Sequence, residues 1–528
     1  MCYNKCSQKR RFLLNKKHYG VFWMYYSTDS DQLIIEDFAM PFSGSLDPNN
    51  RWVKLSRIMP WDHIEQIYLD SMSVETGRRA ISSRIAFGSI FIKESRNFTD
   101  AECVAEIQEN PYMQYFLGLH AFQQEPLFDA SMMVHFRKRF PAEEVSRINE
   151  FVCTGKWPEK ESEDEPQPEQ ETQAHDEEEQ DDDHKQPPKS LRGKKDPNTS
   201  QKKQKRQKKN KGKLIMDATV APSDIKYPTD IDLLNQCRTH LEKAIDLFWE
   251  HVPHNGHKLP YSTKKARRSY LNISKSKKWT LKMLRSGIQE QLRYIELAQK
   301  RLDHFMTQLP DLKLPRYLLD RLEVIPKVYA QQKEMFEKNT HICENRIVSL
   351  AQPFVRPIQR GKRPNPTEFG QKLHLSVVDG YTYLERSSWS NFNEGSDLKT
   401  VVEAYHRRFG FYPEAVLADR IYQTRENRRY CKELGIRLTG PALGRKKAGE
   451  TGAKEARQMY RDSCERNAVE GRNGNLKRRY GLDRIMSKLE ETSETESILN
   501  ILAMNAAQKL RRWLMHFFRI NRLKLVFQ

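Results

Sequence analysis

Residues 213–220 read KLIMDATV, a short apolar run that contains the acid Asp217. An apolar run of this length between polar segments predicts a buried β-strand. A second run, EAVLADR at residues 414–420, carries Asp419 directly after its apolar part. A carboxylate at the end of a buried strand leaves the core and faces whatever binds at the edge of the sheet. The two runs therefore predict two strands that each present an acid at such an edge.

A third acid, Glu470, lies in RDSCERNAVEGRNGNLKRRYG at residues 461–481. This stretch is helix-like, and Glu470 has basic residues on both sides. Three carboxylates can hold two divalent cations and drive phosphoryl transfer on nucleic acid. Asp217, Asp419 and Glu470 are therefore predicted to be catalytic and metal-binding.

Other acids compete for this role. An isolated Asp is more often a helix cap or a surface carboxylate than a metal ligand. The nearest competitors are Asp224, Asp230 and Asp379. We expect Asp230 to cap the helix that follows it.

The composition favours a partner rich in negative charge. The 528 residues carry a formal net charge of +20 and a pI near 9.4, which favours a polyanion such as nucleic acid. The eight Cys are scattered, so they define no small disulfide scaffold. No apolar run approaches the ~20 residues that a membrane helix needs, and no secretory leader follows the start. We expect a bacterial cytoplasmic protein with no membrane partner.

A charged segment divides the chain. Residues 155–184 contain 14 Asp or Glu against 2 Lys, and residues 185–213 contain 13 Lys or Arg against 1 Asp. Such a segment cannot bury enough apolar surface to fold, so we expect a disordered acidic-then-basic linker. Its two halves either attract each other in solvent, or the basic half binds DNA while the acidic half competes. The expected divisions are an N-terminal extension (1–50), a helical domain (51–154), the linker (155–212), a catalytic domain (213–486) with a helical insertion at about 230–345, and a C-terminal helical segment (487–528).

The segment before the linker is predicted to be all-α. Thr99 and Glu102 form a capping-box pattern that begins a helix. Basic residues interleave with the apolar positions, and short basic helices can lie in a DNA major groove. The alternative is a helical domain whose basic side chains only cover apolar surface. The predicted DNA-contacting residues here are Arg78, Arg79, Arg84, Arg137, Lys138 and Arg139.

After the linker, strand and helix signals alternate. KLIMDATV is followed by a helical region that extends to about residue 345. Strand character returns at residues 371–389, where Asp379-Gly380 between apolar runs predicts a hairpin. Helix, strand, helix and strand patterns then lead to the helix of Glu470. This order predicts the α/β class, a mixed sheet flanked by helices with a large helical insertion after the first strand.

Several motifs in the same order resemble the DDE transposases of bacterial insertion sequences. Arg466, Glu470 and Lys477 match the R-x3-E-x6-K signature of that family. The remaining similar segments are 216–235 (first-Asp motif), 348–381 and 392–398 (middle block), 417–436 (second-Asp block) and 110–140 (N-terminal DNA-binding domain).

The resemblance implies an RNase H-like catalytic core and an N-terminal all-α DNA-binding domain. Asp217, Asp419 and Glu470 would hold two Mg²⁺ ions, with Mn²⁺ as a substitute, and Arg466 and Lys477 would contact phosphates beside the scissile bond. The implied partner is double-stranded DNA, both the terminal inverted repeats of the element and the target, and a homodimer is the expected working unit. The alternatives are an inactive transposase-derived DNA-binding protein and an RNase H-like nuclease without strand transfer.

The start of the chain stands outside this resemblance. Residues 1–23 are basic and match nothing in the family, whereas Met24 is followed by an ordinary polar beginning to a folded element. We expect residues 1–23 to be dispensable, with Met24 as an alternative start. The other interpretation is a basic arm that adds a few phosphate contacts.

Overall fold

The computed structural model describes residues 34–41, 44–72, 80–158, 209–251, 263–278, 280–359, 367–440 and 449–526. Three predictions concern residues outside these ranges. They are the dispensable residues 1–23, most of the charged linker, and the DNA contacts of Arg78 and Arg79.

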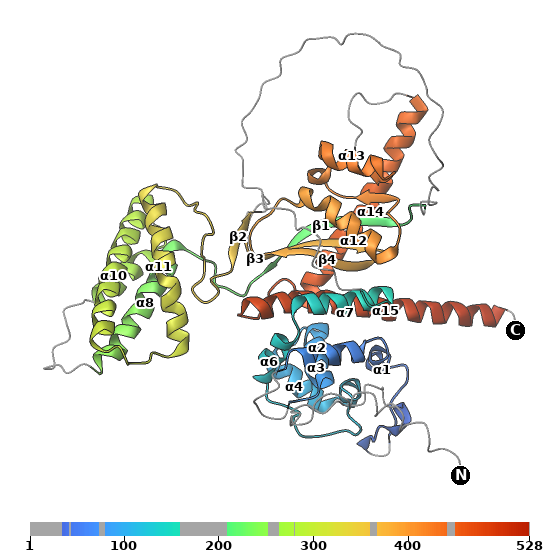
Figure 1. Ribbon diagram of the computed structural model, residues 1–528, viewed down its shortest axis with the longest axis horizontal. Coiled ribbons are helices and arrows are strands. Elements are labelled where there is room, and N and C mark those ends of the chain that lie inside the picture. The colour runs from blue at the N-terminus through green and yellow to red at the C-terminus, as the bar shows by residue number, and fades with distance from the viewer. Residues whose placement is uncertain are drawn as a thin grey trace, which may run out of the picture.

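The N-terminal part is a bundle of short helices, as the sequence predicts (Figure 1). The capping box is confirmed, because the Thr99 side chain accepts from the Glu102 amide and Glu102 bonds back to the Thr99 amide. Large side chains such as Phe87, Phe116 and Phe136 fill a core between the helices. The elements are η1 (Ile35–Asp37), α1 (Arg51–Ser56), α2 (Trp61–Asp70), α3 (Ser83–Arg96), α4 (Asp100–Glu109), α5 (Pro111–Phe116), α6 (Met132–Arg139) and α7 (Ala142–Thr154).

The second part is a mixed sheet with helices on its faces, which confirms the α/β class. Its strands are β1 (Lys213–Pro222), β2 (Arg356–Gln359), β3 (Thr367–Val378), β4 (Tyr381–Ser388), β5 (Ala415–Leu417) and β6 (Arg437–Leu438). The order is β2-β3-β1-β5-β6, and β4 also pairs with β3. β3 runs antiparallel to β1, β2 and β4, while β1, β5 and β6 are mutually parallel. β1 is therefore the strand on which the sheet changes from antiparallel to parallel pairing.

The hairpin between β3 and β4 is confirmed at Asp379-Gly380. Both turn residues have positive φ, 48° and 73°, as a two-residue type I′ turn requires. β2 is an edge strand that the sequence pattern does not predict. It is only four residues long and contains Pro357, and an edge strand tolerates a residue without a backbone donor.

Helices cover the sheet on both faces. One face, with Leu214 and Met216 of β1, packs with α12 (Leu398–Phe409) and α13 (Arg425–Glu433). The other face, with Leu373 and Leu375 of β3, packs with α14 (Gly449–Tyr480) and α15 (Glu490–Val526). The short helices η3 (Glu394–Asp397) and η4 (Arg420–Tyr422) precede α12 and α13.

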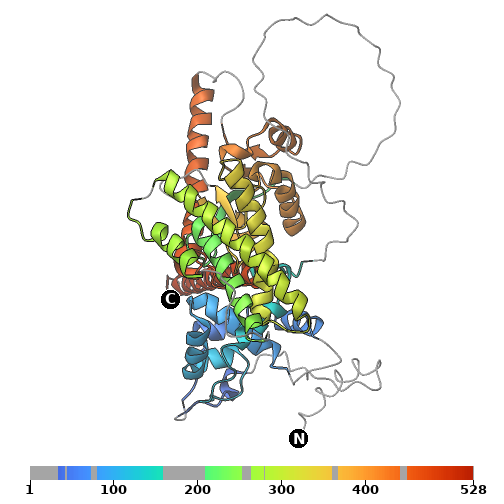
Figure 2. The same ribbon diagram turned by 90° about the vertical axis from the view of Figure 1, so that its left-hand side faces the viewer.

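Four helices lie between β1 and β2 and form a body with a core of its own (Figure 2). They are α8 (Asp230–Trp249), α9 (Thr263–Ser274), α10 (Leu281–Gln308) and α11 (Arg316–Glu337). The expectation that Asp230 caps α8 is wrong. Thr229 is the N-cap residue and accepts from the Asp232 amide, because Asp230 is already inside the helix and pairs with Arg346 at 2.6 Å.

α15 lies between the sheet and the N-terminal helices (Figure 1). Its apolar residues belong to the same core as α3, α6 and α7. Its Asn505 is buried and donates to Asn149 of α7 at 2.8 Å and to the Thr382 carbonyl of β4 at 2.6 Å. The N-terminal helices therefore complete their core with a helix from the far end of the chain.

A buried ion-pair group adds to this junction. Arg408 of α12 pairs with Glu150 of α7 at 3.0 Å and with Glu385 of β4 at 2.6 Å. Burial acts first to raise the pKa of Glu385, but the Arg408 charge and hydrogen bonds outweigh it and leave that pKa lowered. The group ties three elements from two parts of the chain.

No helix among the described residues is long and apolar enough to cross a membrane.

We predict that Arg408→Ala destabilises the protein by about 3–5 kcal/mol, because it leaves the buried Glu385 and the partly buried Glu150 without their cationic partner. Thermal or urea unfolding of the full chain measures this. The control is Lys300→Ala, which breaks the exposed Lys300–Glu296 pair of α10 and should change the melting temperature little. Equal effects of the two substitutions would contradict the role given to Arg408.

Candidate active site

The register of the parallel pair β1–β5 brings two of the predicted acids together. Ile215 pairs with Leu417 at the end of the ladder. Asp217 and Asp419 each stand two residues beyond this pair, and the charge of Asp419 acts to raise the pKa of Asp217, as expected for carboxylates that lie close together. Paired positions point to the same face, and neighbouring strands lie about 4.8 Å apart. The two acids that the sequence separates by two hundred residues are thus neighbours.

The two carboxylates have different surroundings. Asp419 is exposed, and its side chain accepts from the Arg420 amide at 2.8 Å, which makes it the N-cap of η4. Asp217 is partly buried, and burial is the main cause that raises its pKa. The charges of Glu394 and Asp419 raise that pKa further, against the Ala218 amide and Arg466, which lower it. Negative charge is therefore concentrated around Asp217.

α14 crosses this region and carries the third acid. Val469 and Leu476 are buried on its packed side, and Asn473 donates to the Asp217 carboxylate at 3.1 Å. Glu470 lies one turn before Asn473, its side chain is 62% exposed, and it lies 3.8 Å from Arg466. Lys477 follows two turns after Glu470, on the same flank of the helix. Sequence reasoning identified Arg466, Glu470 and Lys477 but missed Asn473.

The three predicted acids are of a residue type that binds divalent cations, but their side chains do not lie together in one cluster. Within the described ranges, no three His, Cys, Asp or Glu side chains form a cluster that could hold a metal ion. Glu470 therefore does not join Asp217 and Asp419 in a ready three-acid group. Carboxylates are nevertheless the ligands that Mg²⁺ takes from proteins. A cation beside Asp217 would offset the repulsion from Glu394 and Asp419 that raises the Asp217 pKa.

A hydrogen-bonded group next to the acids was missed by sequence reasoning. His374 of β3 is fully buried, and its two ring nitrogens contact Tyr422 and Asp397. Glu394 pairs with Lys372 at 2.9 Å and lies 3.4 Å from the Tyr422 hydroxyl. A polar His within the apolar run QKLHLSVV is the one signal that the sequence offers for this group.

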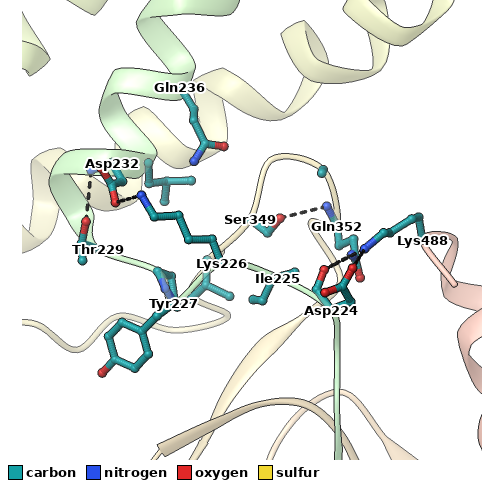
Figure 3. A pocket seen from close by; sticks show the side chains of 14 residues that line it. Asp224, Ile225, Lys226, Tyr227, Thr229, Asp232, Gln236, Ser349, Gln352 and Lys488 are labelled. Carbon is teal, nitrogen blue, oxygen red and sulfur yellow. Dashed lines mark hydrogen bonds and ion pairs between the residues drawn. The ribbon is translucent and has the colours of Figure 1, made fainter. Parts of the chain in front are cut away.

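A pocket of about 230 Å³ lies beyond the end of β1 (Figure 3). Asp224 lies on its wall and pairs with Lys488 and Arg484, both at 2.6 Å. Lys226 on the same wall pairs with Asp232 of α8 at 2.9 Å. Asp224 is thus held in ion pairs that join β1 to the segment before α15. The other competitor, Asp379, lies in the β3–β4 turn.

The basic residues that were predicted to contact DNA differ in burial, and two of them are buried. Arg84 is buried, lies over the Trp61 ring and donates to the Phe116 carbonyl. Arg137 is buried too, and its guanidinium donates to both oxygens of Asp100. These two side chains are used inside the helical domain and do not present their charge to a duplex. We therefore propose internal structural roles for Arg84 and Arg137 in place of the predicted DNA contacts.

The remaining two bases lie at the end of α6. Lys138 is exposed, whereas Arg139 is partly buried and donates to the Ser71 carbonyl. Lys138 is thus the base of this helix that is best placed for contact with a partner.

Two transposase family models match the chain. Residues 416–506 match the "Transposase DDE domain", and residues 41–139 match the "Transposase domain (DUF772)". The first match contains Asp419 and Glu470, the second contains α6, and Asp217 lies outside both.

One curated relative is the "Uncharacterized protein ORF8 in nfe locus" of Rhizobium meliloti, which is 33% identical over 94 residues. The match covers 18% of this chain and 45% of that relative, so the two share less than half of the relative's length. No solved structure matches the chain. The transposase domains matched on each side of the linker support an insertion-sequence transposase of the DDE type.

Proposed function

We propose that this transposase binds the terminal inverted repeats of its own element, cleaves the DNA there and joins the 3′ ends to a target by two-metal-ion phosphoryl transfer. The observation that carries the proposal is the register of β1 and β5, which pairs Ile215 with Leu417 and so brings the chain to the same edge of the sheet at Asp217 and Asp419, two residues beyond. α14, with Glu470, packs beside them through the Asn473–Asp217 hydrogen bond. An RNase H-like core is supported by the mixed sheet around β1 and by the helical insertion after it.

Asp217, Asp419 and Glu470 would be the ligands of two Mg²⁺ ions. When bound, the ions activate the attacking oxygen and stabilise the leaving oxygen of the displacement. The protein's own residues do the positioning. Asn473 orients the Asp217 carboxylate, and Arg466 and Lys477 supply positive charge along the flank of α14 for phosphates beside the scissile bond.

The N-terminal helices are proposed to bind the inverted repeats, with Lys138 as one phosphate contact. The net charge of +20 supports a DNA partner. We further propose a homodimer that holds the two ends of the element together, acting in the bacterial cytoplasm.

The second candidate is a transposase-derived DNA-binding protein without catalysis. The exposure of Glu470 and the absence of a three-acid cluster among the described residues favour it. The partly buried Asp217 beside Asp419 argues against it, because a binding module gains nothing from carboxylates that repel phosphate. Cleavage assays separate the two candidates.

We predict that Asp217→Asn, Asp419→Asn and Glu470→Gln each abolish cleavage of DNA that carries the ends of the element, because each removes a ligand charge but little volume. The measurement is cleavage in Mg²⁺ or Mn²⁺, with gel-shift binding to the same DNA as the control. Binding should be retained. Cleavage by all three variants would overturn the site, and a wild-type protein that binds but never cleaves would favour the second candidate.

For the N-terminal domain, we predict that Lys138→Ala weakens DNA binding uniformly across sequences and lowers the salt slope by about 1, as expected for the loss of one phosphate contact. The melting temperature should not change.

The matched substitution is Arg137→Met, one residue earlier on α6. It removes the buried partner of Asp100 and should lower the melting temperature while the salt slope of the folded protein stays the same. Salt titrations of binding by the full chain measure both slopes. An Arg137→Met slope that falls as far as the Lys138→Ala slope would restore Arg137 as a DNA contact.

A further inference from the structure

We propose that Asp397, His374 and Tyr422 form a buried hydrogen-bonded chain that holds the turn of Asp419 in place beside Asp217. His374 and Tyr422 are then positioning residues of the acid pair. The inference rests on the proposed function, because it assigns these residues a task only if the two acids bind the metal.

The ladder between β1 and β5 does not hold Asp419 by itself. β5 has three residues, and its pairing with β1 ends at Leu417, two residues before Asp419. Beyond that point the main chain turns into η4, where the Tyr422 amide donates to the Asp419 carbonyl at 3.2 Å. Whatever fixes Tyr422 therefore fixes the other end of the turn that carries Asp419.

Tyr422 is fixed by His374. The Tyr422 hydroxyl lies 2.9 Å from Nε2 of His374, and the two rings stack with centroids 5.6 Å apart. Both side chains are fully buried. His374 is paired with Ala218 across the β1–β3 ladder, so it is anchored on the strand next to Asp217. The hydrogen bond thus connects the strand beside one acid to the turn of the other.

The other end of the hydrogen-bonded chain, at Asp397, is also fixed by contacts. Nδ1 of His374 lies 3.3 Å from Asp397, and Asp397 accepts from Arg386 at 2.8 Å. An imidazole that donates from Nδ1 to Asp397 offers Nε2 as the acceptor for the tyrosine hydroxyl. Burial, followed by the charges of Glu394, Asp217 and Asp397, raises the pKa of Tyr422. The hydroxyl therefore keeps its proton, and its two acceptors are Nε2 of His374 at 2.9 Å and the Glu394 carboxylate at 3.4 Å.

A second contact locks the two short helices together. The buried Asn427 donates to the Tyr422 carbonyl at 3.0 Å and to the Gly395 carbonyl at 2.7 Å. A Cβ on Gly395 would lie 2.4 Å from the Ile421 carbonyl oxygen, so a side chain there would push η3 and η4 apart. The relative position of η3 and η4, and with it the turn at Asp419, is therefore fixed by the Asn427 hydrogen bonds and by the close packing at Gly395.

The test compares Tyr422→Phe with Tyr412→Phe in the full-length protein. Tyr422→Phe keeps the ring and removes the hydroxyl that contacts His374. Tyr412→Phe removes a hydroxyl that donates to Glu403 at 3.1 Å in the same domain, outside the acid pair. Asp397→Asn is the second variant, which weakens the other end of the chain if Tyr422→Phe fails to fold.

The first readout is binding of Mn²⁺ to the DNA-free protein, measured from the free-ion signal in electron paramagnetic resonance. Loss of a group that orients a metal ligand costs about 10–100-fold in affinity. We expect Tyr422→Phe to weaken Mn²⁺ binding by about that factor, and Asp397→Asn to weaken it less. Tyr412→Phe should bind as the wild type does.

The second readout is DNA cleavage as a function of Mg²⁺. The half-saturating Mg²⁺ concentration should rise in Tyr422→Phe, while the rate at saturating Mg²⁺ recovers, a split that a general loss of stability would not produce. A Tyr422→Phe protein that matches the wild type in both readouts overturns the positioning role alone. A wild type that binds Mn²⁺ no better than Asp217→Asn overturns the proposed function, and the positioning role with it.

Discussion

The parallel pairing of β1 with β5 is the constraint on which the rest of the candidate site depends. β1 has ten residues and pairs on its other edge with β3, so it is anchored by a long antiparallel ladder. β5 adds only three residues, yet its register sets Leu417 beside Ile215 and so brings the main chain of Asp419, two residues further on, close to Asp217. A slip of one residue would turn Leu417 to the opposite face of the sheet and shift the turn that follows it. Helices α12 and α13 on one face and α14 on the other bury the sheet and so hold that register.

In the whole molecule, α15 is the helix that joins the sheet to the N-terminal helices. It lies between the sheet and the N-terminal helices, and its apolar residues complete a core that neither would close alone. Asn505 and the Arg408 ion pairs add directional contacts across the same junction. The N-terminal helices and the sheet are therefore packed together through α15 and are not connected by the linker alone.

Around the acids, the polar residues form two groups with different tasks. Asn473 and Arg466 approach from α14 and meet Asp217 and Glu470. His374, Tyr422 and Asp397 lie behind the turn of Asp419 and are buried or partly buried. In the second group His374 and Tyr422 are fully buried, whereas Glu470 in the first is largely exposed. This division is typical of a site whose ligands are held rigidly by buried hydrogen bonds while their charged ends remain accessible.

Much of this could be read from local patterns. The hairpin at Asp379-Gly380, the capping box at Thr99 and the helices after β1 follow from residue chemistry within short windows. β2 could not, because four residues that include Pro357 carry no periodic signal. Nor could the cap of α8, where Thr229 and Asp230 are equally suitable by type and only the Arg346 pair decides between them.

The sequence by itself thus determined the class of fold and the order of its main elements, since these depend on apolar periodicity and on residue type, and it predicted the three acids. Only the tertiary structure decided that Arg84 and Arg137 are buried, because Arg84 contacts the Phe116 carbonyl and Arg137 contacts Asp100, each on another helix. It alone decided that Asn473 donates to Asp217 and that His374 contacts Tyr422. The physical reason is that strand register and buried hydrogen bonds join residues from distant parts of the chain, and no local pattern encodes such pairs.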